Sequence, residues 1–228
     1  MAKRSSIYDM IGLVLIGPSR SHTAGVARMG RIARHLLGSL PDKLSITFYN
    51  SFARTYEGHG SDRAILAGLM DMMPDDERIR EAYENAEQQG FEFKMKAVSN
   101  ASALHPNSIR LKMETADRKL NVLGVSLGGG LVAIREIDDY PCDFSGDHIT
   151  LVVTAEDKHG SIAFIANVIA HDQCNIATMS VNRSAKNGEA KLVIELDSDL
   201  NPLTLQYLEN LYWVKDVICL DLREKKEA

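Results

Sequence analysis

Cysteine is scarce in this chain of 228 residues, and its three cysteines lie tens of residues apart, at Cys142, Cys174 and Cys219. They form no Cys-x-x-Cys pair and no Cys/His cluster with the spacing of metal ligands. We therefore expect no metal site in this chain. The odd number of cysteines, without a recognisable secretory signal, favours the reducing cytoplasm as its location.

Long apolar runs and an excess of positive charge are also absent. The apolar run at residues 11–16 is too short to span a membrane, and we expect neither a signal peptide nor a membrane anchor. The chain has 26 basic and 31 acidic side chains, a net charge of −5, which argues against a nucleic-acid partner. Basic residues nevertheless dominate the first forty positions, where Asp9 is the single acid. Such a cationic zone suits a small anionic ligand.

Hydrophobic periodicity predicts an α+β protein. The period of the first part is helical and then, from residue 91 to 137, shifts to two, which predicts an antiparallel meander. The individual elements expected before the meander are a helix ahead of Gly17, helices over residues 24–37, 61–73 and 75–90, and a strand over residues 44–49.

A turn-rich, apolar-poor segment at residues 138–147 predicts a domain boundary, so we expect one domain over residues 1–145 and another over 146–228. The pattern of the second domain predicts the order βαββαβ, the ferredoxin-like split βαβ arrangement. Its elements are strands at 148–154, 175–183, 189–197 and 213–222, a helix after the turn at 157–160, and a helix opening at Asn201-Pro202.

The first segment able to carry chemistry is Gly-Pro-Ser-Arg-Ser-His-Thr-Ala-Gly, residues 17–25. Hydroxyl and backbone N–H groups gathered at a helix N-terminus bind anions such as carboxylates. The candidate binding residues are Ser19, Ser21, His22 and Thr23. Plain capping of the helix by Ser21 or Thr23 is the alternative interpretation.

The second segment is Glu-Gly-His-Gly-Ser-Asp, residues 57–62. The glycines on either side leave the imidazole of His59 open to approach. A histidine titrates near neutral pH, so His59 is a candidate general base. The alternative is a flexible turn with an exposed histidine, in which Ser61 or Asp62 caps the next helix.

Three further segments read first as turns. His-Pro-Asn-Ser at 105–108 is typical of a turn before a strand. Ser-Leu-Gly-Gly-Gly at 126–130 lacks the spacing and the lysine of a P-loop and favours a hairpin turn. Asp157 and Gly160 are explained by a tight turn and a helix cap, but the same place in the second domain is a possible ligand site.

Four of these motifs, in this order and spacing and followed by a βαββαβ module, resemble the β subunit of the two-chain, iron–sulfur-dependent L-serine dehydratases (L-serine ammonia-lyases). The resemblance implies conversion of L-serine to pyruvate and ammonia, a step of amino-acid catabolism and gluconeogenesis. It implies a [4Fe-4S] cluster carried by a partner α chain. Residues 1–145 resemble the allosteric-substrate-binding domain of some phosphoglycerate dehydrogenases, and the second domain resembles an amino-acid-sensing ACT domain.

The resemblance also implies roles for residues. Ser19, Ser21, His22 and Thr23 would hold the substrate carboxylate, and His59 would take the Cα proton. Arg20 departs from the serine common in the family, which leaves the role of Arg20 open. We expect a homodimer through the ACT-like domains besides the α chain. The competing hypothesis is a non-catalytic, amino-acid-sensing regulatory subunit.

Overall fold

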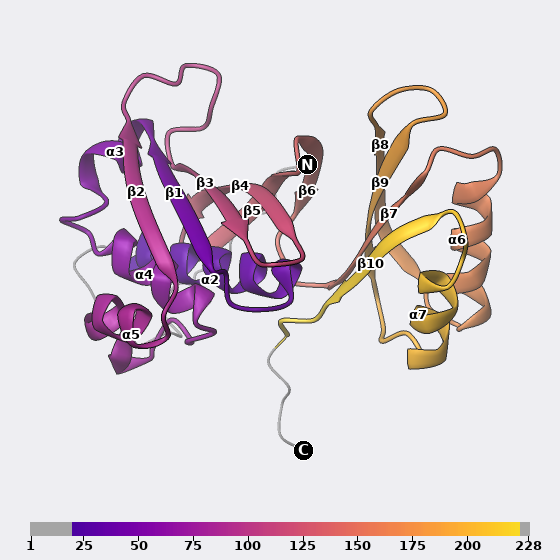
Figure 1. Ribbon diagram of the computed structural model, residues 1–228, viewed down its shortest axis with the longest axis horizontal. Coiled ribbons are helices and arrows are strands. Elements are labelled where there is room, and N and C mark those ends of the chain that lie inside the picture. Colours follow the sequence, from indigo (N-terminus) through magenta and orange to yellow (C-terminus); the bar gives the residue numbers. More distant parts are fainter. Residues whose placement is uncertain (1–19, 224–228) are drawn as a thin grey trace. The chain divides into compact units, whose positions relative to one another are not determined.

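The computed structural model describes residues 20–223. The chain divides into two compact units between Asp139 and Tyr140 (Figure 1). The helix expected ahead of Gly17 lies outside the described residues. Each unit combines helices with one β-sheet, so the expected α+β class is confirmed. Within the described residues, no helix is long and apolar enough to cross a membrane.

The first unit carries five strands of a six-stranded mixed sheet in the order β2-β1-β3-β4-β5-β6; the sixth strand, β6, begins at Tyr140, just after the division of the chain. The alternation predicted for residues 44–49 is confirmed, because Leu44, Ile46 and Phe48 of β1 are buried. The strands are β1 (Lys43–Tyr49), β2 (Glu92–Val98), β3 (Ser108–Glu114), β4 (Lys119–Gly128), β5 (Leu131–Ile137) and β6 (Tyr140–Phe144).

The meander predicted from residue 91 onward is correct for β3, β4 and β5, which pair as antiparallel neighbours. It is wrong for β2. This strand runs parallel to β1, with Leu44 opposite Phe93, and β1 lies between β2 and β3. The two strands are joined by the helical segment between them, as a parallel pair requires.

The helices of this unit are α2 (Arg20–Leu37), α3 (Asn50–Thr55), α4 (Ser61–Leu69), a 3₁₀ turn η1 (Glu77–Glu81) and α5 (Ala82–Gln88). Two predicted helices are shorter than expected. The helix predicted over 61–73 ends at Leu69, where the backbone of Asp71 turns to a φ of 61°. The helix predicted over 75–90 is divided into η1 and α5, and the Asp76 side chain caps η1 by accepting from the Arg78 N–H.

Helix α2 packs on β4 and β5, and α4 packs on α2. The helical period predicted over residues 24–37 agrees with burial, since the apolar residues of α2 at helical spacing are all buried: Val26, Met29, Ile32, Ala33, Leu36 and Leu37. The two helices approach so closely that a Cβ on Gly30 would lie 2.6 Å from the carbonyl oxygen of Ile65. A Cβ on Gly68 would collide with the carbonyl oxygen of Ala27. On the other side of α2, a Cβ on Gly124 would lie 2.6 Å from Sδ of Met29. Glycines thus allow α2 to pack closely against α4 on one side and against β4 on the other.

The second unit has the predicted order βαββαβ, in an antiparallel sheet with the strand order β10-β7-β9-β8. Both helices lie on one side of this sheet (Figure 1). Asn201 caps the second helix by accepting from the Leu203 N–H, and Pro202 follows at its first position. The elements are β7 (Ile149–Glu156), α6 (Ser161–His171), β8 (Ile176–Arg183), β9 (Glu189–Leu196), α7 (Pro202–Glu209) and β10 (Val214–Leu220).

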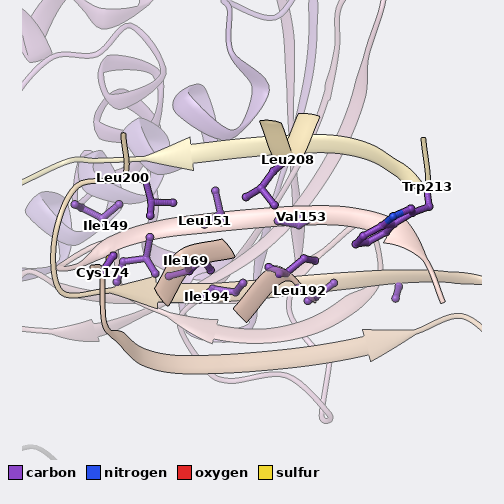
Figure 2. Close-up of a cluster of buried hydrophobic side chains, with 14 residues drawn as sticks. Ile149, Leu151, Val153, Ile169, Cys174, Leu192, Ile194, Leu200, Leu208 and Trp213 are labelled. Atoms are coloured by element: carbon purple, nitrogen blue, oxygen red, sulfur yellow. The ribbon is translucent and has the colours of Figure 1, made fainter. Parts of the chain in front are cut away.

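A single buried cluster fills the space between this sheet and its helices (Figure 2). It takes alternate residues of the central strands, such as Leu151 and Val153 of β7, together with Ile169 of α6 and Leu208 of α7. Cys174 belongs to the same cluster and is 5% exposed. Its thiol therefore lies in an apolar core and is remote from solvent.

Candidate functional site

The segments of residues 17–25 and 57–62 meet at the first turn of α2. The hydroxyl of Thr23 donates a hydrogen bond of 3.1 Å to the backbone carbonyl of His59, 36 residues later in the chain. Thr23 is buried. Because His59 directly precedes Gly60, the N-cap of α4, this bond joins the start of α2 to the start of α4. Two helix N-termini therefore lie together, and each carries a partial positive charge.

The third motif, residues 126–130, lies against the same turn of α2. A Cβ on Gly25 would lie 3.1 Å from Oγ of Ser126, and one on Gly130 would lie 3.8 Å from Cβ of Ala24. The predicted hairpin turn is confirmed: the motif connects β4 to β5, and Gly128, Gly129 and Gly130 all have positive φ. A run of three such residues is accessible to glycine without steric cost.

The fourth motif, residues 105–108, forms the predicted turn into β3 and links the hairpin to α3. The N–H of Ser126 donates to the carbonyl of Asn107 at 3.0 Å, and that of Ser51 donates to the carbonyl of Pro106 at 2.9 Å. The Ser108 hydroxyl closes the turn by donating to the carbonyl of His105 at 2.8 Å. The four motifs therefore form one connected region.

Asn50 supports this region and was not predicted. Its backbone has a φ of 52°, and its side-chain amide donates to the carbonyls of Ala101 and Leu104, while its Oδ1 accepts from the Ala101 N–H. The residue thereby holds the loop that precedes the fourth motif. Its sequence signal was weak, since an asparagine after a strand reads as an ordinary turn residue.

Buried polar side chains single out the same region. Within the described part of the first unit, five polar or charged residues are buried, and every one lies in one of the four motifs. Burying a polar group is costly unless it is hydrogen-bonded, so such a concentration points to a function beyond stability. The five are Thr23, Ser61, Asp62, Ser108 and Ser126.

His59 lies in the five-residue turn between α3 and α4, residues 56–60, and is half-buried. Its N–H donates to the carbonyl of Thr55 at 3.0 Å, while among residues 20–223 no hydrogen bond engages its imidazole. Gly60 has a φ of 71°, which favours glycine after this histidine. The residue is thus held at its backbone, and both ring nitrogens are left without a hydrogen bond by the part of the chain that the structure describes.

The capping role considered for Ser61 and Asp62 is wrong. The N-cap of α4 is Gly60, and no side chain makes a capping hydrogen bond there. Asp62 instead turns toward α5, where its Oδ2 accepts a hydrogen bond of 2.8 Å from the Tyr83 hydroxyl. Burial, together with this bond to the carboxylate, raises the pKa of Tyr83 far above its usual value. Tyr83 therefore remains a hydrogen-bond donor at every physiological pH.

The residues expected to bind the substrate carboxylate are described unequally. Ser19 lies outside the described residues, and for Ser21 and His22 the structure describes the backbone alone, within α2. This helix already includes Arg20, which lies before the predicted start at residue 24. Thr23 therefore lies inside the helix, where its hydroxyl reaches His59, and the alternative of Thr23 as an N-cap is wrong.

In the second unit, Asp157 and Gly160 occupy the connection between β7 and α6 as expected. The Asp157 carboxylate accepts from the Arg183 guanidinium at 2.9 Å and from the Asn187 N–H at 3.1 Å. The bond from Arg183 is the main reason that the pKa of Asp157 is lowered. Gly160 has a φ of 81° and is the N-cap of α6. The turn-and-cap interpretation accounts for both residues.

No group of three or more His, Cys, Asp or Glu side chains is arranged to hold a metal ion within residues 20–223. Cys142, Cys174 and Cys219 form no disulfide. Cys174 lies in the apolar core, and burial raises the pKa of the Cys219 thiol. These side chains do not fit an iron–sulfur cluster, which needs several thiolates converging on one point.

Known proteins resemble the chain over nearly its whole length. It is 41% identical over 209 residues to the "Probable L-serine dehydratase, beta chain" of Bacillus subtilis (strain 168), which covers 92% of this chain and 94% of the relative. The "L-serine dehydratase, beta chain" of Peptoniphilus asaccharolyticus is 28% identical over 86% of this chain and 88% of its own length. A D-3-phosphoglycerate dehydrogenase of Synechocystis is 22% identical over 85% of this chain, but over 35% of its own.

The profile of the family described as "Serine dehydratase beta chain" matches residues 6–136, which include all four motifs of the first unit. The match therefore coincides with the region in which the buried polar side chains gather. Together with the relative of 41% identity, it shows that this chain belongs to the serine dehydratase beta chain family.

Proposed function

We propose that this chain is the β subunit of an L-serine ammonia-lyase, which converts L-serine into pyruvate and ammonia by loss of water across Cα–Cβ. Membership of the serine dehydratase beta chain family supports this proposal. The words "beta chain" in the names of both relatives support a partner α chain for the present protein as well. The enzyme is then a lyase assembled from two kinds of chain.

The single observation that carries the proposal is the hydrogen bond between Thr23 and His59. The substrate carboxylate binds at the start of α2, to Ser19, Ser21, His22 and Thr23, where the helix dipole favours an anion. His59 then takes the Cα proton. This proton is weakly acidic, so a positioned base contributes about 10²–10⁴-fold to the rate. The bond keeps the base next to the anion site.

The [4Fe-4S] cluster belongs to the α chain in this proposal, since the described side chains of the present chain do not fit one. When bound, the cluster supplies a Lewis acid for the leaving hydroxyl group. The contribution of this chain is to bind the carboxylate, to hold His59 beside Cα and to accept the proton there.

The two domains have separate roles in the proposal. Residues 1–145 are an allosteric-substrate-binding-like domain, which the similarity to D-3-phosphoglycerate dehydrogenases supports. Residues 146–228 are an ACT domain, which the βαββαβ order and the sheet order support. Asp157 and Gly160 mark its possible amino-acid site, and its sheet edges mediate a homodimer. The three cysteines form no disulfide, and this supports a cytoplasmic location.

The proposal is tested by L-serine turnover of the α and β chains reconstituted without oxygen. Replacement of His59 by Asn is expected to lower kcat by about 10²–10⁴-fold with the complex and its cluster colour intact. His171→Asn, which changes an exposed histidine of α6, is the matched control and retains turnover. Near-normal turnover by His59→Asn would contradict the proposal and favour a non-catalytic, amino-acid-sensing subunit.

A further inference from the structure

Two buried polar atoms at the start of α4 have no hydrogen-bond partner. Among the described residues, they are Oγ of Ser61 and Oδ1 of Asp62, in side chains whose residues are 1% and 6% exposed. They belong to the first two residues of a nine-residue helix whose N-terminus no side chain caps. Both lie within three residues of His59.

Of the two atoms, Oδ1 of Asp62 is the stronger indication of a missing partner, because it belongs to a carboxylate. Tyr83 satisfies Oδ2 of Asp62, but Oδ1 receives nothing. A buried acceptor without a donor costs about 1–3 kcal/mol, and more when the group is charged. Because folding of the described residues gains nothing from this arrangement, the two oxygens point to a donor other than the residues that the structure describes.

Substrate chemistry identifies the class of that donor. L-serine is a zwitterion at neutral pH, so a site that holds its carboxylate at a helix N-terminus must also accept hydrogen bonds from its ammonium group. A primary ammonium group offers three donors and a positive charge. A carboxylate oxygen and a hydroxyl oxygen on consecutive residues offer acceptors for two of these donors, and the carboxylate matches the charge.

We propose that Asp62 and Ser61 bind the ammonium group of an amino-acid ligand, whose carboxylate lies at the start of α2. The inference rests on the proposed function and extends it, since it makes the first unit selective for amino acids over carboxylic acids without an amino group. Asp62 is then a substrate-binding residue, and Tyr83 holds its carboxylate in place.

The ligand reaches the two oxygens when the turn over residues 56–60 shifts. The first residue of this turn, Tyr56, is stacked on Phe48 with ring centroids 4.4 Å apart. Around its two glycines there is more room: a Cβ on Gly60 would meet no atom within 4 Å, and one on Gly58 would meet a single carbonyl oxygen at 3.9 Å. The movement therefore involves residues 57–60, and it breaks the hydrogen bond from Thr23 to the His59 carbonyl until the turn closes again.

The test uses two ligands that differ only by the ammonium group and that cannot be dehydrated, L-alanine and propionate. Their dissociation constants are measured by calorimetry on the assembled α–β complex. The native complex is expected to prefer L-alanine. Asp62→Asn should weaken L-alanine roughly 10- to 100-fold, as loss of a charged hydrogen bond predicts, and leave propionate unchanged. Ser61→Ala should weaken L-alanine by a smaller factor.

Glu87→Gln, which neutralises an exposed carboxylate of α5, is the matched control and should keep the preference. If Asp62→Asn does not fold, as judged by its thermal melting, Ser61→Ala decides the matter alone. The inference would be overturned if Asp62→Asn weakened both ligands equally or left the preference for L-alanine unchanged. It would also be overturned if the native complex showed no preference for L-alanine over propionate. Failure of the proposed function is recognised separately, by undiminished serine turnover in His59→Asn.

Discussion

Gly30 of α2 and Gly68 of α4 lie against each other with no room for a side chain: the Cβ position of Gly68 is 3.0 Å from the Cα atom of Gly30. The same position collides with the backbone carbonyl of Ala27. Backbone cannot withdraw as a flexible side chain can. The glycine contact therefore fixes the separation of the two helices whose first turns hold the candidate site.

Gly68→Ala is expected to destabilise the protein by about 1–3 kcal/mol, since an added methyl group in a packed interior forces the backbone to move. Chemical denaturation of the isolated chain measures the loss. Gly58→Ala is the control, because its Cβ would make only an ordinary contact at 3.9 Å. Equal stability of the two variants would show that α2 and α4 separate at little cost.

Thr23→Val should lower the free energy of unfolding by about 1 kcal/mol, because it removes the donor to the His59 carbonyl while keeping the shape of the side chain. Turnover should fall with it, since His59 loses its anchor. Thr23→Ser keeps a hydroxyl group and should retain most of the stability and most of the turnover. The comparison requires denaturation curves and kcat/KM for the two variants. Similar kcat/KM values for Thr23→Val and Thr23→Ser would show that the hydrogen bond does not contribute to catalysis.

The chain should lose stability in acid through Asp71. Burial acts to raise the pKa of this carboxyl, but hydrogen bonds from Arg31 and His35 outweigh burial and lower it. A lowered pKa in the folded state means that the contribution to stability is present above the unfolded value of about 3.9, and is lost as pH falls through the folded value.

Asp71→Asn should therefore flatten the dependence of stability on pH below about pH 4. Asparagine suits the test because it tolerates the φ of 61° found at this position. Glu87→Gln, at an exposed position of α5, serves as the control. The measurement is the denaturation midpoint from pH 3 to pH 7, and an unchanged slope in Asp71→Asn would exclude this carboxylate as the source.

A homodimer through the ACT-like sheet is expected to depend on an edge strand. The two edges of that sheet are β8 and β10, and Val181 of β8 is 37% exposed. Val181→Lys places a charge on this edge and should shift the protein from a dimer toward its monomer of 25.2 kDa. Light scattering after gel filtration measures the mass. A native protein that is monomeric at high concentration would contradict the dimer.

Local hydrophobic patterns correctly predicted the helices and strands that bury one face and expose the other. The alternation of Leu44, Ile46 and Phe48 in β1 and the order of the second unit needed no knowledge of distant residues. The predicted direction of β2 was wrong because a strand shows the same period of two residues whether its neighbour is parallel or antiparallel. The short helix α3 was missed because six residues give too little periodicity to recognise.

The candidate site divides in the same way. Glycines and a histidine in a short motif identified the segment around His59, and an anion-binding pattern identified that around Thr23. Their contact involves residues 36 positions apart, and no local pattern encodes it. Asp62 was read as a cap because an acidic residue in the first helical turn is usually explained so; its actual partner, Tyr83, comes from a different helix.

The distances along the chain between the motifs have a consequence for biosynthesis. The first helical turn of the site lies near residue 20, whereas the hairpin turn packed on it ends at Gly130 and the second strand of the hairpin, β5, ends at Ile137. A ribosome that has released only the chain up to α4 has therefore made a chain that still lacks β4 and β5, the strands on which α2 packs. The ability to bind a ligand should arise late and abruptly during synthesis, once β4 and β5 have left the exit tunnel.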